Sequence, residues 1–254
     1  MSRPTSQATT RPLEAQIILR LVDTNGRTVE RSLTRPVLAD VDRIGVWGIS
    51  YAGGHVLIVG ATDPRVKCII SNIPVVDGYE NMRRVHGAAR FNDLVDALVK
   101  DRRERAQSGG SGGRMAFSSL RPNKELSTWP FPLIHNVFHD IKVKEAPLHE
   151  HWSTAESTEL LLNYNVFPFA KRIYNTPTLM VVAEGDEITL WDMEIEAFNA
   201  IPSPQKQLAV IPKVSHMSLY SQKAHLQVAG EAAAMFVKQH LIGRAADKAR
   251  AAAE

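Results

Sequence analysis

The sequence predicts an α/β fold with a mostly parallel sheet, and three features support this prediction. Short apolar runs rich in β-branched residues, typical of buried parallel strands, occur at residues 43–48 and 65–74, and a further strand is expected at 176–184. Segments with a helical period separate these runs, and strand and helix alternate strictly in the last third of the chain. With 254 residues, 44% of them hydrophobic, the chain is long enough for one large domain without disulfide or metal support.

Composition limits the class of protein. The net charge is +3, and Lys and Arg are interspersed with acids, so a nucleic-acid partner is not predicted. No apolar run approaches the roughly 18 residues that a membrane span requires. The single cysteine, Cys68, precludes an internal disulfide and suits a reducing compartment. We therefore predict a soluble, cytoplasmic protein with no membrane partner.

The first part of the chain is predicted to hold a tail, a hairpin and the start of the core. Residues 1–14 contain arginines and hydroxyl side chains without an apolar face, which indicates a disordered tail. Two β-prone runs surround Asn25-Gly26 within residues 15–34, and this dipeptide tolerates the positive φ angles of a tight hairpin turn. We assign residues 15–78 to the N-terminal part of the core.

After the hairpin, residues 43–48 ("RIGVWG") are predicted to form a buried parallel strand. The pattern becomes helical from Tyr51 to Gly60. The turn signal Asp63-Pro64 then precedes residues 65–74, which we expect to be a second buried strand.

The middle of the chain differs in character, and we predict that residues 79–170 form a cap or lid inserted into the core. Residues 79–107 are charged and helical in period, and "SGGSGG" at 108–113 is typical of a flexible joint. Residues 114–151 are rich in Pro, His and aromatic residues without a sustained period, which favours irregular structure. A helix over 156–174 is expected to return the chain to the core.

The last third is predicted to complete the core over residues 171–243, with a tail at 244–254. The expected elements are a strand at 176–184, a helix at 190–201, a strand at 206–211 and a long amphipathic helix at 223–241.

The stretch "WGISYAGGHV" places a serine where the strand at 43–48 gives way to a helix. A serine at such a turn adopts a strained conformation, and its neighbours two residues away, Gly48 and Ala52, must be small for strand and helix to approach. The turn would expose the hydroxyl of Ser50 and direct the backbone N–H of Tyr51 toward an oxyanion. The alternative is a glycine-rich turn with an incidental serine. Neither G-x-G-x-x-G nor G-x-x-x-x-G-K-[ST] is present, so no nucleotide cofactor is predicted.

A nucleophilic serine needs a base and an acid at the same edge of the sheet. Asp186 follows the strand at 176–184, and His216 follows the next strand, 30 residues later. The order Ser, acid, His is that of the nucleophile-elbow hydrolases. Glu184 and Glu187 are rival acids, but the shorter Asp186 directly after Gly185 is better placed to hold an imidazole.

The remaining histidines have weaker claims to a catalytic role. His55 lies one helical turn past Ser50, and four others lie in the predicted cap: His135, His139, His149 and His151. No pair combines metal-ligand spacing with a carboxylate partner. We therefore predict neither a metal site nor a cofactor.

Three segments together, "DRIGVWGISYAGGHVLIVGATDPRVKCIISNIP", "TPTLMVVAEGDEIT" and "PKVSHMSLY", resemble the α/β-hydrolase superfamily. They are most similar to the branch of fungal polyketide acyltransferases and thiohydrolases, which includes bacterial dienelactone-hydrolase-like relatives. The resemblance covers about residues 41 to 242 and implies an α/β-hydrolase sandwich with a cap over an acyl pocket. It implies that Ser50 is the nucleophile, Asp186 the acid and His216 the general base. Such enzymes usually carry further strands and a second oxyanion donor before the serine, whereas 49 residues precede Ser50 here, so we expect the N-terminal strands to be partly missing.

The resemblance implies a serine hydrolase or acyltransferase that acts on an ester or thioester of a small molecule. Its substrate would be a polyketide-type acyl group of secondary metabolism, free or bound to a carrier protein. The alternative hypothesis is a catalytically impaired α/β-hydrolase-like protein that binds an acyl ligand or a partner. Missing strands would leave a sheet edge exposed, and such an edge favours a homodimer.

Overall fold

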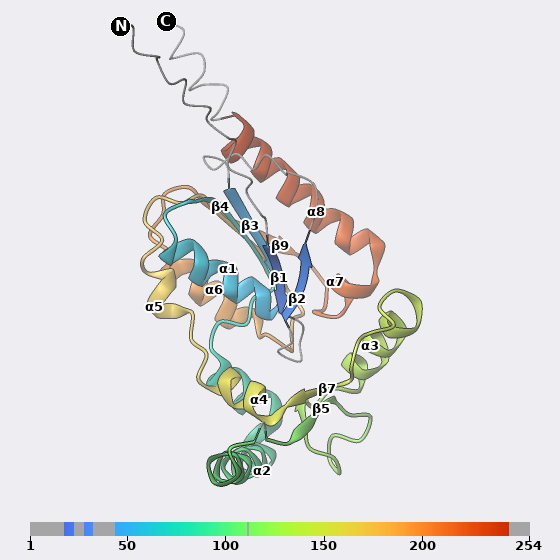
Figure 1. Ribbon diagram of the computed structural model, residues 1–254. Helices are drawn as coiled ribbons and strands as arrows, with labels where there is room; N and C mark the ends of the chain where they lie inside the picture. The colour runs from blue at the N-terminus through green and yellow to red at the C-terminus, as the bar shows by residue number, and fades with distance from the viewer. Residues whose placement is uncertain (1–17, 23–27, 33–43, 111, 244–254) are drawn as a thin grey trace, which may run out of the picture.

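A four-stranded parallel sheet organises the chain in the computed structural model, which describes residues 18–22, 28–32, 44–110 and 112–243 (Figure 1). Its strands are β3 (Ile44–Ile49), β4 (Val66–Asn72), β8 (Thr178–Ala183) and β9 (Lys206–Ile211), in the order β3-β4-β8-β9. Every neighbouring pair is parallel. The predicted α/β class and mostly parallel sheet are thereby confirmed.

Helices cover both faces of this sheet. On one face lie α1 (Tyr51–Thr62) and α6 (Trp191–Ala200), and on the other lies α8 (Lys223–Val237), which continues into a π-helical turn at Lys238–Gly243 (Figure 1). Successive residues of a strand point to opposite faces. Thus Ile69 packs in the α1 layer, whereas its neighbours Cys68 and Ile70 pack in the α8 layer.

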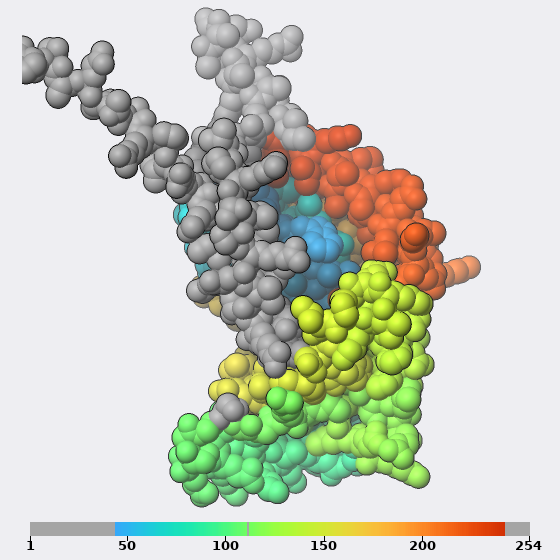
Figure 2. Space-filling model, turned by 45° about the vertical axis from the view of Figure 1, so that its right-hand side comes forward, coloured from blue at the N-terminus to red at the C-terminus, as the bar shows by residue number. Residues whose placement is uncertain are grey.

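The central and edge strands differ in burial. β8 is buried along its whole length and β4 almost so, as predicted for parallel strands between two helical layers. The strand predicted at 43–48 is present as β3, but the prediction that it is buried is wrong. Among the described strands β3 pairs only with β4, and Trp47 is 57% exposed. In Figure 2 this part of the core, in blue, is visible between α8 and the yellow-green segment of the chain.

The predicted hairpin is confirmed. β1 (Ile18–Val22) and β2 (Thr28–Ser32) pair antiparallel, with Ile18 opposite Ser32. The expected turn at Asn25-Gly26 lies outside the described residues, as do residues 33–43, the tail at 1–14 and the tail at 244–254.

A second layer, which we call the cap layer, spans residues 78–162 and lies beyond one end of the sheet (Figure 1). Its elements are α2 (Gly78–Ser108), β5 (Arg114–Ser118), β6 (Ser127–Trp129), α3 (Pro132–Lys144), β7 (Trp152–Thr154) and α4 (Ala155–Leu162). β5 lies between β6 and β7 in a small mixed sheet. The expectation of irregular structure over 114–151 is therefore wrong in part. Strands of three to five residues are too short to show a period, and their pairing joins segments far apart in the chain.

The single helix predicted over 156–174 is also wrong, because the chain breaks after α4 and resumes as α5 (Phe167–Ala170). Pro168 has no N–H to continue a helix. The intervening backbone instead bonds a distant segment, since Gly78 N–H donates to Tyr164 O and Val166 N–H donates to Val76 O, both at 2.8 Å. α5 packs against α1 and α6, so the cap layer ends before the predicted residue 170.

The glycine-rich stretch at 108–113 contains the turn by which the chain leaves α2. Gly109 ends the helix in the left-handed conformation, and the Gly113 N–H donates to Asp101. Arg105, one turn before the end of α2, bonds Asp101 at 2.8 Å and Glu159 of α4 at 2.6 Å. These contacts tie α2 to α4. None of the helices described is long and apolar enough to cross a membrane.

Candidate active site

Ser50 lies in a sharp turn between β3 and α1. Its φ of 56° and ψ of −121° belong to a region that non-glycine residues rarely occupy. Two backbone hydrogen bonds hold it there: the Ser50 N–H donates to Asn72 O at 2.9 Å, and the Val75 N–H donates to Ser50 O at 3.1 Å. The strain predicted for this serine is therefore present and is supported by β4 and the loop that follows it.

The small residues around Ser50 are required by close backbone approaches. A Cβ atom on Gly48 would lie 2.5 Å from the carbonyl carbon of Ala52 and closer still to its oxygen. A Cβ on Gly53 would lie 2.6 Å from Asn72 O. These distances are shorter than van der Waals contact, so the turn excludes side chains at both glycines.

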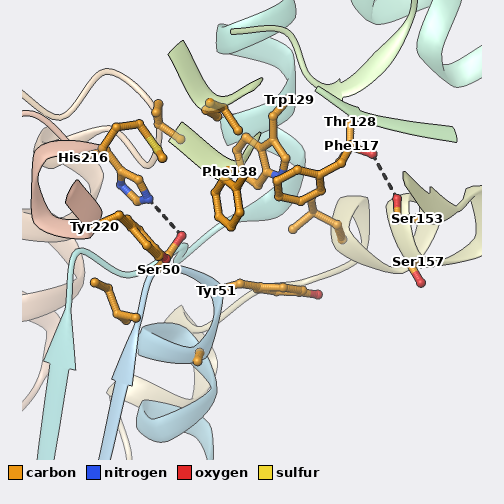
Figure 3. Close-up of a pocket in the computed structure, with 16 residues that line it drawn as sticks. Ser50, Tyr51, Phe117, Thr128, Trp129, Phe138, Ser153, Ser157, His216 and Tyr220 are labelled. Carbon is orange, nitrogen blue, oxygen red and sulfur yellow. Dashed lines mark hydrogen bonds between the residues drawn. The ribbon is translucent and has the colours of Figure 1, made fainter. Parts of the chain in front are cut away.

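The structure brings the three predicted residues together. The Nε2 atom of His216 lies 3.1 Å from Ser50 Oγ (Figure 3), and the Nδ1 atom lies 2.7 Å from Asp186 Oδ2. His216 is 3% exposed and Asp186 is 2% exposed. The rival acids Glu184 and Glu187 are both exposed, and Glu184 accepts a hydrogen bond from the Lys213 N–H instead.

Asp186 is held as a carboxylate by its hydrogen bonds. Its Oδ1 atom accepts the backbone N–H groups of Ile188 and Thr189, each at 2.9 Å. Burial alone raises the pKa of Asp186, but the neighbouring His216 and the hydrogen bonds from His216 and Thr189 outweigh burial and hold the pKa below its usual value. The carboxylate is therefore available to orient the imidazole.

Tyr51 is the first residue of α1, so its backbone N–H has no acceptor within the helix. Its side chain lines the pocket beside Ser50, and its ring meets that of Tyr164 edge-on, with centroids 4.7 Å apart. Burial raises the pKa of Tyr51 to about 12, so its hydroxyl is neutral near pH 7.

A cavity of about 140 Å³ opens beside Ser50, between the core and the cap layer. Most of its wall is apolar, and the aromatic side chains of Phe117, Trp129 and Phe138 lie close to Ser50 (Figure 3). Three hydroxyl residues form the far end of the pocket in the same view: Thr128, Ser153 and Ser157. The cavity therefore suits an apolar group with a hydrogen-bonding function at its end.

Two further residues at the site were not found by sequence analysis. Tyr220 packs against the imidazole of His216, with centroids 5.7 Å apart, and its hydroxyl interacts with the side chain of Ser50. Burial raises the pKa of Tyr220 to about 12. Thr189 contacts both Asp186 and His216 through its hydroxyl. In the sequence, only the spacing of four residues from His216 could have indicated that Tyr220 lies near the imidazole.

The other histidines considered in the sequence do not take part in the hydrogen-bonded series of Ser50, His216 and Asp186. His55 is exposed, and its ring packs against that of Tyr51 at a tilt of 40°, with centroids 4.5 Å apart. His135 and His151 pack together in the cap layer with centroids 4.3 Å apart. Within the described ranges, no three His, Cys, Asp or Glu side chains are grouped so that they could hold a metal ion.

Comparison with models of protein families assigns the chain to one family. The model described as X-Pro dipeptidyl-peptidase (S15 family) matches residues 39–218, more than half of the chain, and the match includes Ser50, Asp186 and His216. The chain belongs to the S15 family.

Relatives of this S15-family chain include two fungal proteins. The acyltransferase drtE of Aspergillus calidoustus is 26% identical over 179 residues, which are 66% of this chain and 54% of drtE. The thiohydrolase aneE of Aspergillus aculeatus is 24% identical over 216 residues, which are 82% of this chain and 65% of aneE. The S15-family chain spans about two thirds or less of the length of these curated relatives.

The solved structure of the α/β hydrolase GrgF from a Penicillium species matches the S15-family chain with a TM-score of 0.62 and 18% identity. The match covers 80% of this chain and 65% of GrgF. It confirms the α/β-hydrolase fold recognised in the sequence.

Proposed function

We propose that this S15-family chain is a serine hydrolase or acyltransferase that acts on an ester or thioester of a small molecule. The hydrogen-bonded series Ser50 Oγ, His216 Nε2, His216 Nδ1 and Asp186 Oδ2 carries the proposal. This is the arrangement in which a base activates a serine and an acid orients the base.

In the proposed reaction His216 removes the proton of Ser50 as Oγ attacks the carbonyl carbon of the substrate. The backbone N–H of Tyr51 stabilises the oxyanion, and Asp186 stabilises the imidazolium that forms. His216 then gives its proton to the departing alcohol or thiol, which leaves an acyl group on Ser50. Water, an alcohol or an amine then loses a proton to His216 as it attacks this acyl group. The bond between the acyl carbon and Ser50 Oγ breaks, and His216 returns the proton to Oγ.

The pocket favours an uncharged acyl group. A dipeptide substrate would bring a charged N-terminal ammonium into the cavity, and burial of such a charge is costly without a carboxylate partner. Among the residues that the structure describes, none of those lining the pocket is Asp or Glu. The fungal relatives are named as an acyltransferase and a thiohydrolase, and this supports a polyketide-type acyl group, free or bound to a carrier protein. We also propose that the reaction belongs to cytoplasmic secondary metabolism and that β3, the end strand of the described sheet, forms the contact of a homodimer.

We also assign the hydroxyl of Tyr220 as a second oxyanion donor. Its side chain lies beside Ser50 (Figure 3), and in the tetrahedral intermediate the oxyanion is two bonds from Oγ, so we infer that the same hydroxyl donates to it. Replacing Tyr220 with Phe is therefore expected to lower kcat about 100-fold with little change in folding. The matched control is Tyr174→Phe, because Tyr174 is exposed and is not among the residues that line the pocket. A kcat in Tyr220→Phe equal to that of the control would contradict this role.

The first test of the proposal is reaction with a fluorophosphonate probe, followed by intact mass measurement on the wild type and on Ser50→Ala. We expect one adduct in the wild type and none in the variant, because Oγ is the atom that the base activates. Circular dichroism and urea unfolding establish that both proteins are folded. If the folded wild type forms no adduct, the chain is an α/β-hydrolase-like binding protein for an acyl ligand or a partner, and the catalytic proposal fails.

A further inference from the structure

Glu194 is a second acidic residue behind the proposed catalytic residues, and the proposed mechanism does not use it. It lies in the first turn of α6, is 0% exposed, and has its Oε1 atom 2.7 Å from the hydroxyl of Thr189. The same hydroxyl lies 2.9 Å from Asp186 Oδ2 and 3.1 Å from His216 Nδ1. One hydroxyl thus contacts two carboxyl groups and the imidazole.

The number of protons limits how these contacts are made. A threonine hydroxyl donates one hydrogen bond and accepts two. If both carboxyl groups were ionised, Thr189 would donate to one and face the other with a lone pair, which is repulsive. Both carboxyl contacts are satisfied when Glu194 carries a proton on Oε1: Glu194 then donates to Thr189, and Thr189 donates to Asp186, while the Nδ1–H group of His216 donates to Asp186 at 2.7 Å. The two carboxyl groups would thus exist in different protonation states.

The surroundings show which carboxyl group holds the proton. Asp186 has four hydrogen-bonding contacts on its two oxygens, which stabilise the charged form. The Oε2 atom of Glu194 is buried and has no hydrogen-bond partner in the described part of the chain. Burial, and next the charge of Asp186, raise the pKa of Glu194 well above its usual value. Asp192, also on α6, raises it further, although Arg84 of α2 pairs with Asp192 at 2.7 Å.

We propose that Glu194 is a neutral carboxylic acid that fixes the Thr189 hydroxyl as a donor to Asp186, and that it is thereby a positioning residue for the Asp186–His216 pair. A charged Glu194 would instead accept the one hydrogen bond that Thr189 can donate. Asp186 would then lose this donor, and a second anion would lie behind the imidazole. The consequence for catalysis rests on the proposed function, whereas the protonation state and the hydrogen-bond direction do not.

Protonation is tested by urea unfolding as a function of pH, on the wild type, on Glu194→Gln and on Glu196→Gln. Glu196 is an exposed residue of the same helix and serves as the matched control. The side chain of an unfolded Glu has a pKa of about 4.3. If the pKa of Glu194 is higher in the folded protein, its protonation stabilises the fold fully only below about pH 4.3. This stabilisation is lost as the pH rises from about 4.3 to the folded-state pKa. In this window the unfolding equilibrium constant of the wild type is expected to rise about tenfold per pH unit relative to Glu194→Gln.

Parallel pH curves for the wild type and Glu194→Gln would show that Glu194 is ionised when folded, and would overturn the proposal. Glu196→Gln is expected to follow the wild type. Infrared spectroscopy of the wild type at neutral pH gives a second measurement that needs no variant. A carbonyl band of a protonated carboxylic acid supports the proposal, and absence of such a band contradicts it.

The direction of the hydrogen bond is tested by the proton NMR signal of the His216 Nδ1–H group. Thr189→Val removes the donor to Asp186 and is expected to shift this signal, whereas Thr189→Ser and Glu194→Gln keep a donor and should preserve it. An unchanged signal in Thr189→Val would exclude the positioning role. These measurements need no catalysis, so they remain decisive even if Ser50 does not react with the fluorophosphonate probe. If it does react, Thr189→Val should also slow labelling about tenfold or more, because hydrogen bonds to charged groups are the stronger ones.

Discussion

Replacing Asp186 with asparagine is expected to lower kcat about 10⁴-fold, with the fold retained. The asparagine side chain has nearly the same shape, but its amide group can donate a hydrogen bond to Nδ1 of His216. The imidazole would then carry its proton on Nε2, the atom that must accept the proton of Ser50. The measurements are kcat on an activated ester and the rate of fluorophosphonate labelling, with urea unfolding to establish that the variant is folded.

The two rival acids provide the controls for this prediction. Glu184 and Glu187 belong to the same loop but are exposed, and Glu184 bonds the Lys213 backbone rather than the imidazole. Glu184→Gln and Glu187→Gln are therefore expected to keep nearly full activity. An equal loss in Glu187→Gln, or a loss of less than about tenfold in Asp186→Asn, would mean that Asp186 does not orient His216.

Replacing Gly48 with alanine is expected to disrupt the turn at Ser50. The added Cβ would collide with the carbonyl group of Ala52, so the strand and helix must move apart. Overpacking of this kind destabilises a fold by about 1 to 3 kcal/mol. A displacement of Ser50 by about 1 Å would also slow the reaction with the probe about 100-fold. Urea unfolding and labelling rates measure the two effects separately.

Gly230 of α8 is the matched control, because a Cβ at this position meets nothing within 4 Å. Gly230→Ala is expected to raise the free energy of unfolding by about 0.5 to 1 kcal/mol, since alanine favours helix more than glycine does. If Gly48→Ala were as stable and as reactive as Gly230→Ala, the close approach of β3 and α1 would not be required for the site.

The cap layer supplies much of the lining of the pocket that lies beside the turn at Ser50. Ser50 and His216 lie at the ends of core strands, while Phe117, Trp129 and Phe138 approach from the cap layer (Figure 3). The serine alone specifies no substrate. The cap layer supplies the apolar wall and the distal hydroxyl groups, so exchange of cap residues is the route by which the acyl preference would change.

Features that depend on neighbouring residues were predictable from the sequence. The alternation of strand and helix, the hairpin, and the strained turn at Ser50 follow from local periodicity and from the positions of small residues. The order and spacing of Ser50, Asp186 and His216 were also sufficient to predict that they meet, because parallel strands end at the same edge of a sheet.

Only the tertiary structure decided which residues meet across long separations. Periodicity does not distinguish an edge strand from a central one, so the exposure of Trp47 was not foreseen. Nor does periodicity indicate that the Val166 N–H donates to the carbonyl oxygen of Val76, a bond that replaces a helical one within the helix predicted over 156–174. The contact of Thr189 with His216, 27 residues later, arises because the loops that follow β8 and β9 meet at the same end of the sheet. Sequence patterns record local preferences, whereas packing between distant segments forms the pocket and the buried surroundings of Asp186 and His216.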